Sequence, residues 1–192
     1  MDENLLFNLA FENDAQGLTN AISAGYDPNI IHPRAGHTPL QVACETNSLE
    51  AISILLGMGA DPNLQFTKIS RTGGLSFRNR VALMYVSSTA ATDILANAGA
   101  DLDICDDQGW SSLALAVKSC EDVLVRKLVQ LGASTELQDP LHMKYPALLN
   151  ICEDKMQFLG RISKDEPNAV IDSRLVALES IRNILINLPA AK

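Results

Sequence analysis

Short runs of apolar residues at helical spacing recur along the chain, and polar turns separate them. The runs that precede Gly59 and Gly132 place aliphatic side chains three to four residues apart, as on one face of an α-helix. Glycine directly after such a run permits the left-handed residue with which many helices end. The pattern therefore predicts short amphipathic helices, several of which end at a glycine.

One short motif follows these predicted helices four times. The copies read Gly-Tyr-Asp-Pro-Asn from Gly25, Gly-Ala-Asp-Pro-Asn from Gly59, Gly-Ala-Asp-Leu-Asp from Gly99 and Gly-Ala-Ser-Thr-Glu from Gly132. The glycines are 34, 40 and 33 residues apart. Self-similarity at such a period is typical of repeat architectures, in which each unit buries its apolar face against the next.

A second motif marks where a helix begins. Thr38 opens Thr-Pro-Leu-Gln-Val-Ala, Ser111 opens Ser-Ser-Leu-Ala-Leu-Ala, and a weaker copy lies at Tyr145-Pro146-Ala147-Leu148. Threonine and serine cap helices, and proline is favoured in the first turn. Thr38 lies 23 residues before Asp61, and Ser111 lies 23 before Ser134. We therefore expect two short helices of equal total length in each of these units.

Together the motifs resemble the ankyrin repeat, whose signature includes Thr-Pro-Leu-His-x-Ala; this chain has Gln41 in place of the histidine. The resemblance implies an all-α fold, an ankyrin-repeat solenoid of stacked helix-turn-helix units with hairpin-like loops. One domain, 1–192, would hold repeats at about 1–31, 32–64, 65–104 and 105–138 and a C-terminal cap at 139–192. In the cap, helices are expected from Pro146 to about Arg161 and from about Val170 to Leu188.

The third repeat carries an insertion. Eighteen residues separate Asp61 from Arg80, where the other repeats have 9 or 10 at the equivalent place. Within residues 66–78, alternating polar and apolar residues flank Thr72-Gly73-Gly74, which is typical of a hairpin. We call this segment the finger. Lys68, Arg71, Arg78 and the neighbouring Arg80 give it a charge of +4, which suits either a solvated loop or a finger that reaches into a partner.

Members of the ankyrin family use loop tips and inner helix surfaces to bind proteins, so the resemblance implies a set of contact residues. Trp110, the one tryptophan of the chain, is our first choice for an interface anchor. The finger would contribute Phe66, Lys68, Arg71, Phe77 and Arg78. The loop tips would contribute His32, Arg34, Ala35 and His37 in the second repeat, Asn79 in the third, Cys105, Asp107 and Gln108 in the fourth, and His142 and Lys144 in the C-terminal cap.

Composition excludes several other classes of function. The net charge of −8 disfavours nucleic acid and anionic membranes, so a basic or neutral protein partner is expected. The sequence contains no catalytic constellation and no cofactor motif. We also expect no metal site, because Asp101, Asp103, Asp106 and Asp107 do not fit a calcium loop and the four cysteines lack a C-x-x-C pair.

No apolar stretch reaches the roughly 18 residues of a membrane span. Met1-Asp2-Glu3-Asn4 lacks the basic start of a signal peptide. We expect a cytoplasmic protein, or an exported one whose signal has been removed. The predicted function is non-enzymatic binding of another protein by a monomer, with a dedicated inhibitor of an enzyme or toxin, of the immunity type, as the alternative.

Overall fold

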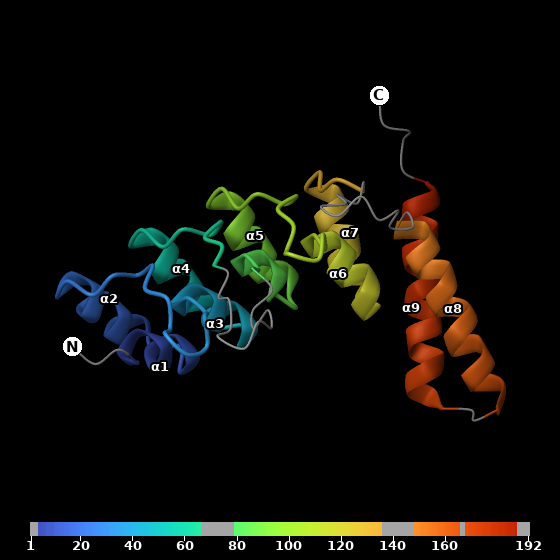
Figure 1. Cartoon of the computed structure of the whole chain (residues 1–192), viewed down its shortest axis with the longest axis horizontal. Helices are drawn as coiled ribbons and strands as arrows, with labels where there is room; N and C mark the ends of the chain where they lie inside the picture. The colour runs from blue at the N-terminus through green and yellow to red at the C-terminus, as the bar shows by residue number, and fades with distance from the viewer. Residues whose placement is uncertain (1–3, 67–78, 136–147, 166–167, 188–192) are drawn as a thin grey trace. The chain divides into compact units, whose positions relative to one another are not determined.

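The computed structural model describes residues 4–66, 79–135, 148–165 and 168–187, and within them every regular element is a helix (Figure 1). The all-helical fold class predicted from the sequence is therefore confirmed. The α-helices are α1 Leu5–Phe11, α2 Ala15–Ser23, α3 Pro39–Glu45, α4 Leu49–Gly57, α5 Thr89–Asn97, α6 Ser112–Ser119, α7 Asp122–Gln130, α8 Leu148–Asp165 and α9 Ala169–Ile186, with a 3-10 turn, η1, at Ala82–Met84. The finger beyond Phe66 lies outside the described residues.

The repeated glycines end helices as predicted. Gly25, Gly59, Gly99 and Gly132 follow the cap residues of α2, α4, α5 and α7, with φ between 85° and 99°. After Gly59, the N–H of Ala60 donates back to the carbonyl of Leu55 at 2.9 Å. This closes the helix end and turns the chain towards the next repeat. A side chain at these positions would be strained by the left-handed backbone.

The predicted helix starts at Thr38 and Ser111 are also confirmed, whereas residues 145–147 of the weaker third motif lie outside the described residues. The Thr38 hydroxyl accepts from the N–H of Gln41 at 3.2 Å, and the Gln41 side chain accepts from the N–H of Thr38 at 3.0 Å. Pro39 occupies the first turn, where its missing N–H costs nothing. Ser111 caps α6 by accepting from the N–H of Ala114. Both helices therefore begin where the sequence motif places them.

The chain divides into two compact units, residues 1–108 and 109–192. In the first unit, α1 packs on α3 and α3 on η1, while α2 packs on α4 and α4 on α5. The unit thus has a row of first helices and a row of second helices, which Figure 1 shows side by side. Fully buried aliphatic residues, among them Leu18, Leu40, Ile52, Leu83 and Leu95, fill the space between the rows.

Two asparagines hold the loops of this unit in register. Asn29 donates from Nδ2 to the carbonyl of Gly59 at 2.9 Å and accepts at Oδ1 from the N–H of Asp61 at 2.7 Å. Asn63 repeats both bonds one unit later, to the carbonyl of Gly99 at 3.0 Å and from the N–H of Asp101 at 2.8 Å. The last residue of the repeated motif is therefore the link between successive repeats.

The third repeat differs from the predicted pair of helices, because its first helix is only the 3-10 turn η1. In the second repeat, the helix caps Thr38 and Ser48 are ten residues apart, whereas Val81 and Ser88, which precede η1 and α5, are seven apart. The missing three residues correspond to one helical turn. Val81 and its neighbours to Met84 remain buried, so the short turn still fills the core.

The second unit contains the helix pair α6 and α7 and the longer hairpin α8 and α9. Helix α8 packs on α6 and α9 on α7, and the two long helices pack on each other. Leu178 and Ile181 of α9 are completely buried, and the Cys152 thiol donates to the carbonyl of Leu178 at 3.2 Å. The two C-terminal helices predicted from the sequence are confirmed, whereas the assignment of repeat and cap boundaries stays a prediction.

Candidate protein-binding surface

The loop tip of the second repeat is built around His32. Its Nδ1 accepts from the backbone N–H groups of Arg34 and Ala35 at 3.2 and 2.9 Å, so Nε2 carries the hydrogen and donates to Asn4 Oδ1 at 3.0 Å. The ring also packs edge-on against Phe7, with the centroids 5.0 Å apart. His32 was expected to be an exposed contact residue, but it is half-buried and holds the turn together.

The residues that this turn presents are Arg34 and Ala35, which are both exposed as predicted. His37 is half-buried, because its ring lies 5.3 Å from that of Tyr85. Burial raises the pKa of the Tyr85 phenol, with Arg80, Glu45 and Asp106 as nearby charges. At this tip Arg34 is therefore the cationic side chain open to a partner.

The base of the finger joins the loop tip of the fourth repeat. Gln65 donates from Nε2 to the carbonyls of Asn79 and Cys105, each at 2.9 Å. Arg80 forms an ion pair with Asp106, Nε to Oδ2 3.3 Å, and the Asp106 side chain has no exposed surface. Arg80 was counted in the basic charge of the finger, but its guanidinium neutralises a buried carboxylate, so it is a structural residue.

The neighbouring residues of this tip have different surroundings. Asp106 accepts at Oδ1 from the N–H of Gln108 at 3.0 Å, and the Gln108 side chain is exposed. Asp107 is half-buried, and its Oδ1 is buried without a hydrogen bond from the described residues. Gln108 therefore projects as a contact residue should, while Asp107 is partly enclosed.

Trp110, the expected anchor in the second unit, is half-buried. The Nζ of Lys118 on α6 lies 4.6 Å from the centroid of its ring. Such a cation–π contact covers part of the ring and fixes its position. Lys118 therefore covers part of the Trp110 ring, and only the rest of the ring is open to a partner.

Six of the proposed contact residues lie outside the described residues. They are Lys68, Arg71, Phe77 and Arg78 of the finger and His142 and Lys144 of the last loop. Phe66, at the start of the finger, is half-buried. Their roles stay predictions.

The structure shows two exposed residues on first helices that the sequence analysis missed. Phe11, the last residue of α1, is 65% exposed, and Glu45, the last residue of α3, is also exposed. The repeat period could have found Phe11, because 34 residues later the same position holds the charged Glu45. An exposed phenylalanine and an exposed carboxylate at equivalent positions of successive first helices are suitable contacts for a partner that is both apolar and basic.

Charge is distributed unevenly between the two units. Residues 1–108 contain thirteen acidic and five basic residues, a net charge of −8, whereas residues 109–192 contain ten of each. In the described part of the first unit the basic residues are Arg34 and Arg80, and Arg80 is paired with Asp106. The electrostatic field of the first unit therefore favours a basic partner.

The described residues contain no group of histidine, cysteine and carboxylate side chains arranged to hold a metal ion. Burial raises the pKa of the Cys44 thiol to about 12 and that of Cys152 to about 11, so both stay protonated at neutral pH. None of the helices described is long and apolar enough to cross a membrane.

The comparisons with known proteins agree with the fold. The family model described as Ankyrin repeat matches residues 35–65, a segment that includes α3 and α4 and ends just before the finger. Residues 35–65 are therefore an ankyrin repeat. Palmitoyltransferase AKR1 of Kluyveromyces lactis is 33% identical over 97 residues, which are 50% of this chain and 12% of that protein. Because so little of that protein is matched, its activity does not transfer to this chain.

Proposed function

We propose that this protein is a non-enzymatic module that binds another protein through its loop tips, its row of first helices and the finger. Ankyrin repeats are protein–protein interaction modules. The observation that carries the proposal is the loop edge of the first unit, where Asn29 and Asn63 fix the backbone of successive tips and exposed side chains such as Arg34 project from them. A preorganised surface loses little conformational entropy on binding.

The chemistry of this surface narrows the partner to a protein with a basic or neutral contact face. The net charge of −8 resides in the first unit, which repels nucleic acid and anionic lipid. Phe11 and Glu45 add an apolar and an acidic contact on the first helices. We propose that the protein is a cytoplasmic monomer when it is not bound.

The experiment uses the full chain as bait in its native source, with cross-linking and mass spectrometry, followed by calorimetry with the purified partner. Trp110→Ala and a Phe66→Ala/Phe77→Ala double variant should each weaken binding by about 1–2 kcal/mol without loss of helicity. Val123→Ala is the matched control, because Val123 is a 63% exposed apolar residue on the second helix α7. Equal affinity for all variants would refute this contact surface.

The inhibitor alternative rests on the finger, which is eight or nine residues longer than the equivalent loops of the neighbouring repeats. If the finger plugs an active site, shortening it to the length of those loops should abolish inhibition of the partner enzyme while the protein stays folded. If the partner's activity is the same with and without the bound protein, the function is that of an adaptor.

A further inference from the structure

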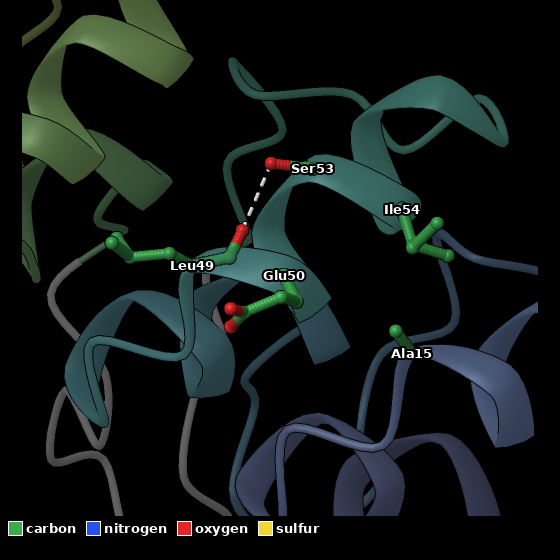
Figure 2. A pocket seen from close by; sticks show the side chains of 5 residues that line it. All are labelled: Ala15, Leu49, Glu50, Ser53 and Ile54. Carbon is green, nitrogen blue, oxygen red and sulfur yellow. Dashed lines mark hydrogen bonds between the residues drawn. The ribbon is translucent and has the colours of Figure 1, made fainter.

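A shallow hollow lies between the second helices of the first and second repeats, away from the loop tips and first helices discussed so far. Ala15 at the start of α2 and four residues of α4 line it, as Figure 2 shows: Leu49, Glu50, Ser53 and Ile54. Its volume is about 370 Å³, enough for one or two large side chains. All five lining residues belong to the first compact unit.

The floor of the hollow is hydrocarbon. Ala15, Leu49 and Ile54 contribute aliphatic surface, and all three are half-buried. The hydroxyl of Ser53 donates to the carbonyl of Leu49 at 2.9 Å, within the same helix. Since that hydroxyl is already engaged, the hollow favours an apolar side chain over a hydrogen-bonding one.

The one charged group of the hollow is held in place from the neighbouring repeat. Asn13 has a left-handed backbone, with φ of 58°, in the turn between α1 and α2. Its Nδ2 donates to Glu50 Oε2 at 2.5 Å, and its Oδ1 accepts from the N–H of Ala51 at 3.0 Å. The hydrogen bond from Asn13 lowers the pKa of Glu50 below its ordinary value, so the carboxylate is ionised at neutral pH.

We propose that this hollow is a second docking site, which takes an aliphatic side chain of a partner segment while an adjacent lysine or arginine pairs with Glu50. Hydrocarbon surface beside a fixed carboxylate matches that combination of side chains. The net charge of −8 on the surrounding unit attracts a basic segment and repels an acidic one. The site goes beyond the proposed function, because it lies on the second helices.

The test is a titration of the ¹⁵N-labelled full chain, followed by NMR, with three synthetic helical peptides: a leucine–lysine amphipathic peptide, a leucine–glutamate peptide and a serine–lysine peptide. The leucine–lysine peptide should shift the amides of Ala15, Leu49, Glu50, Ser53 and Ile54 in a saturable way. The leucine–glutamate peptide should not shift them. The serine–lysine peptide should bind more weakly, because it lacks the apolar contact.

Two variants separate the charge from the apolar contact. Glu50→Gln keeps an acceptor for Asn13 and removes the charge. It should therefore lower the affinity for the leucine–lysine peptide roughly two- to fivefold. Glu179→Gln, the same change at an exposed carboxylate on α9 of the second unit, is the control and should leave the affinity unchanged. Ser53→Phe fills the hollow from its exposed rim and should abolish the shifts there while circular dichroism stays the same.

The proposal is overturned if the peptide shifts only the loop tips, if the leucine–glutamate peptide binds equally well, or if the two Glu→Gln variants lose affinity equally. Shifts confined to the loop tips would support the proposed function and reject the second site. Loss of shifts at the hollow in Ser53→Phe, with the loop tips unaffected, would support the second site independently.

Discussion

The bridge made by Asn29 gives the sharpest test of how successive repeats are held together. Its side chain makes one donor and one acceptor bond to the backbone of the next loop, at Gly59 and Asp61. The variant Asn29→Ala removes both and leaves a carbonyl and an N–H without their partner. Because Asn29 is half-buried, water can reach part of the gap.

The expected cost follows from these two bonds. A neutral hydrogen bond contributes about 0.5–1.5 kcal/mol to stability, so two contribute about 1–3 kcal/mol. Partial replacement by water brings the expected loss to about 1–2 kcal/mol. With an m-value of about 2 kcal/mol/M, the midpoint of urea unfolding should fall by roughly 0.5–1 M. Asn29→Asp keeps the acceptor for the Asp61 N–H but places an oxygen against the Gly59 carbonyl. It should therefore be at least as destabilising as Asn29→Ala.

Equilibrium unfolding in urea, followed by far-ultraviolet circular dichroism, measures the effect. Asn20→Ala is the matched control, because Asn20 is exposed on α2 and its side chain is bonded only to Gln16 among the described residues. The loss of that local pair is offset by the better helix propensity of alanine, so no net change is expected. If Asn29→Ala unfolds at the same urea concentration as Asn20→Ala, the bridges do not hold the repeats in register.

Three further predictions concern the fold and its thiols. Thr38→Ala should lower the free energy of unfolding by about 1–2 kcal/mol, because it removes the buried cap of α3, and Thr38→Ser should restore most of it in the same urea assay. Arg80→Met should cost about 2–3 kcal/mol because it leaves the buried Asp106 carboxylate without its cation, and the double variant with Asp106→Asn should recover part of that loss. Iodoacetamide should modify half-exposed Cys105 before Cys44, whose pKa of about 12 keeps it a protonated thiol, and mass spectrometry that finds the reverse order would contradict the burial described.

The contact surface was only partly predictable from the sequence. The repeat period correctly placed Arg34 and Gln108 at exposed tips. The same mapping treated His32 and Trp110 as contact residues, because a motif position does not show which ring a neighbour covers. His32 is engaged by Asn4 and Phe7, and Trp110 by Lys118, through contacts that arise only when the chain folds back on itself.

By itself the sequence determined the class of fold and those helix ends that carry a cap residue or an end glycine. Caps such as Thr38 and end glycines such as Gly59 act through backbone groups within a few residues, so they can be recognised locally. The repeat period of the motifs predicted the repeat architecture, because each unit of such a fold packs on its neighbour.

Only the tertiary structure decided which side chains join one repeat to the next and which remain available to a partner. Asn13 reaches Glu50 across 37 residues, Asn47 accepts from Ser88 across 41, and Arg80 pairs with Asp106 across 26. No spacing rule specifies these bonds, since each depends on how a turn residue of one repeat meets a helix or loop of another. That geometry holds Glu50 beside an apolar hollow and pairs Arg80 with the buried Asp106 carboxylate.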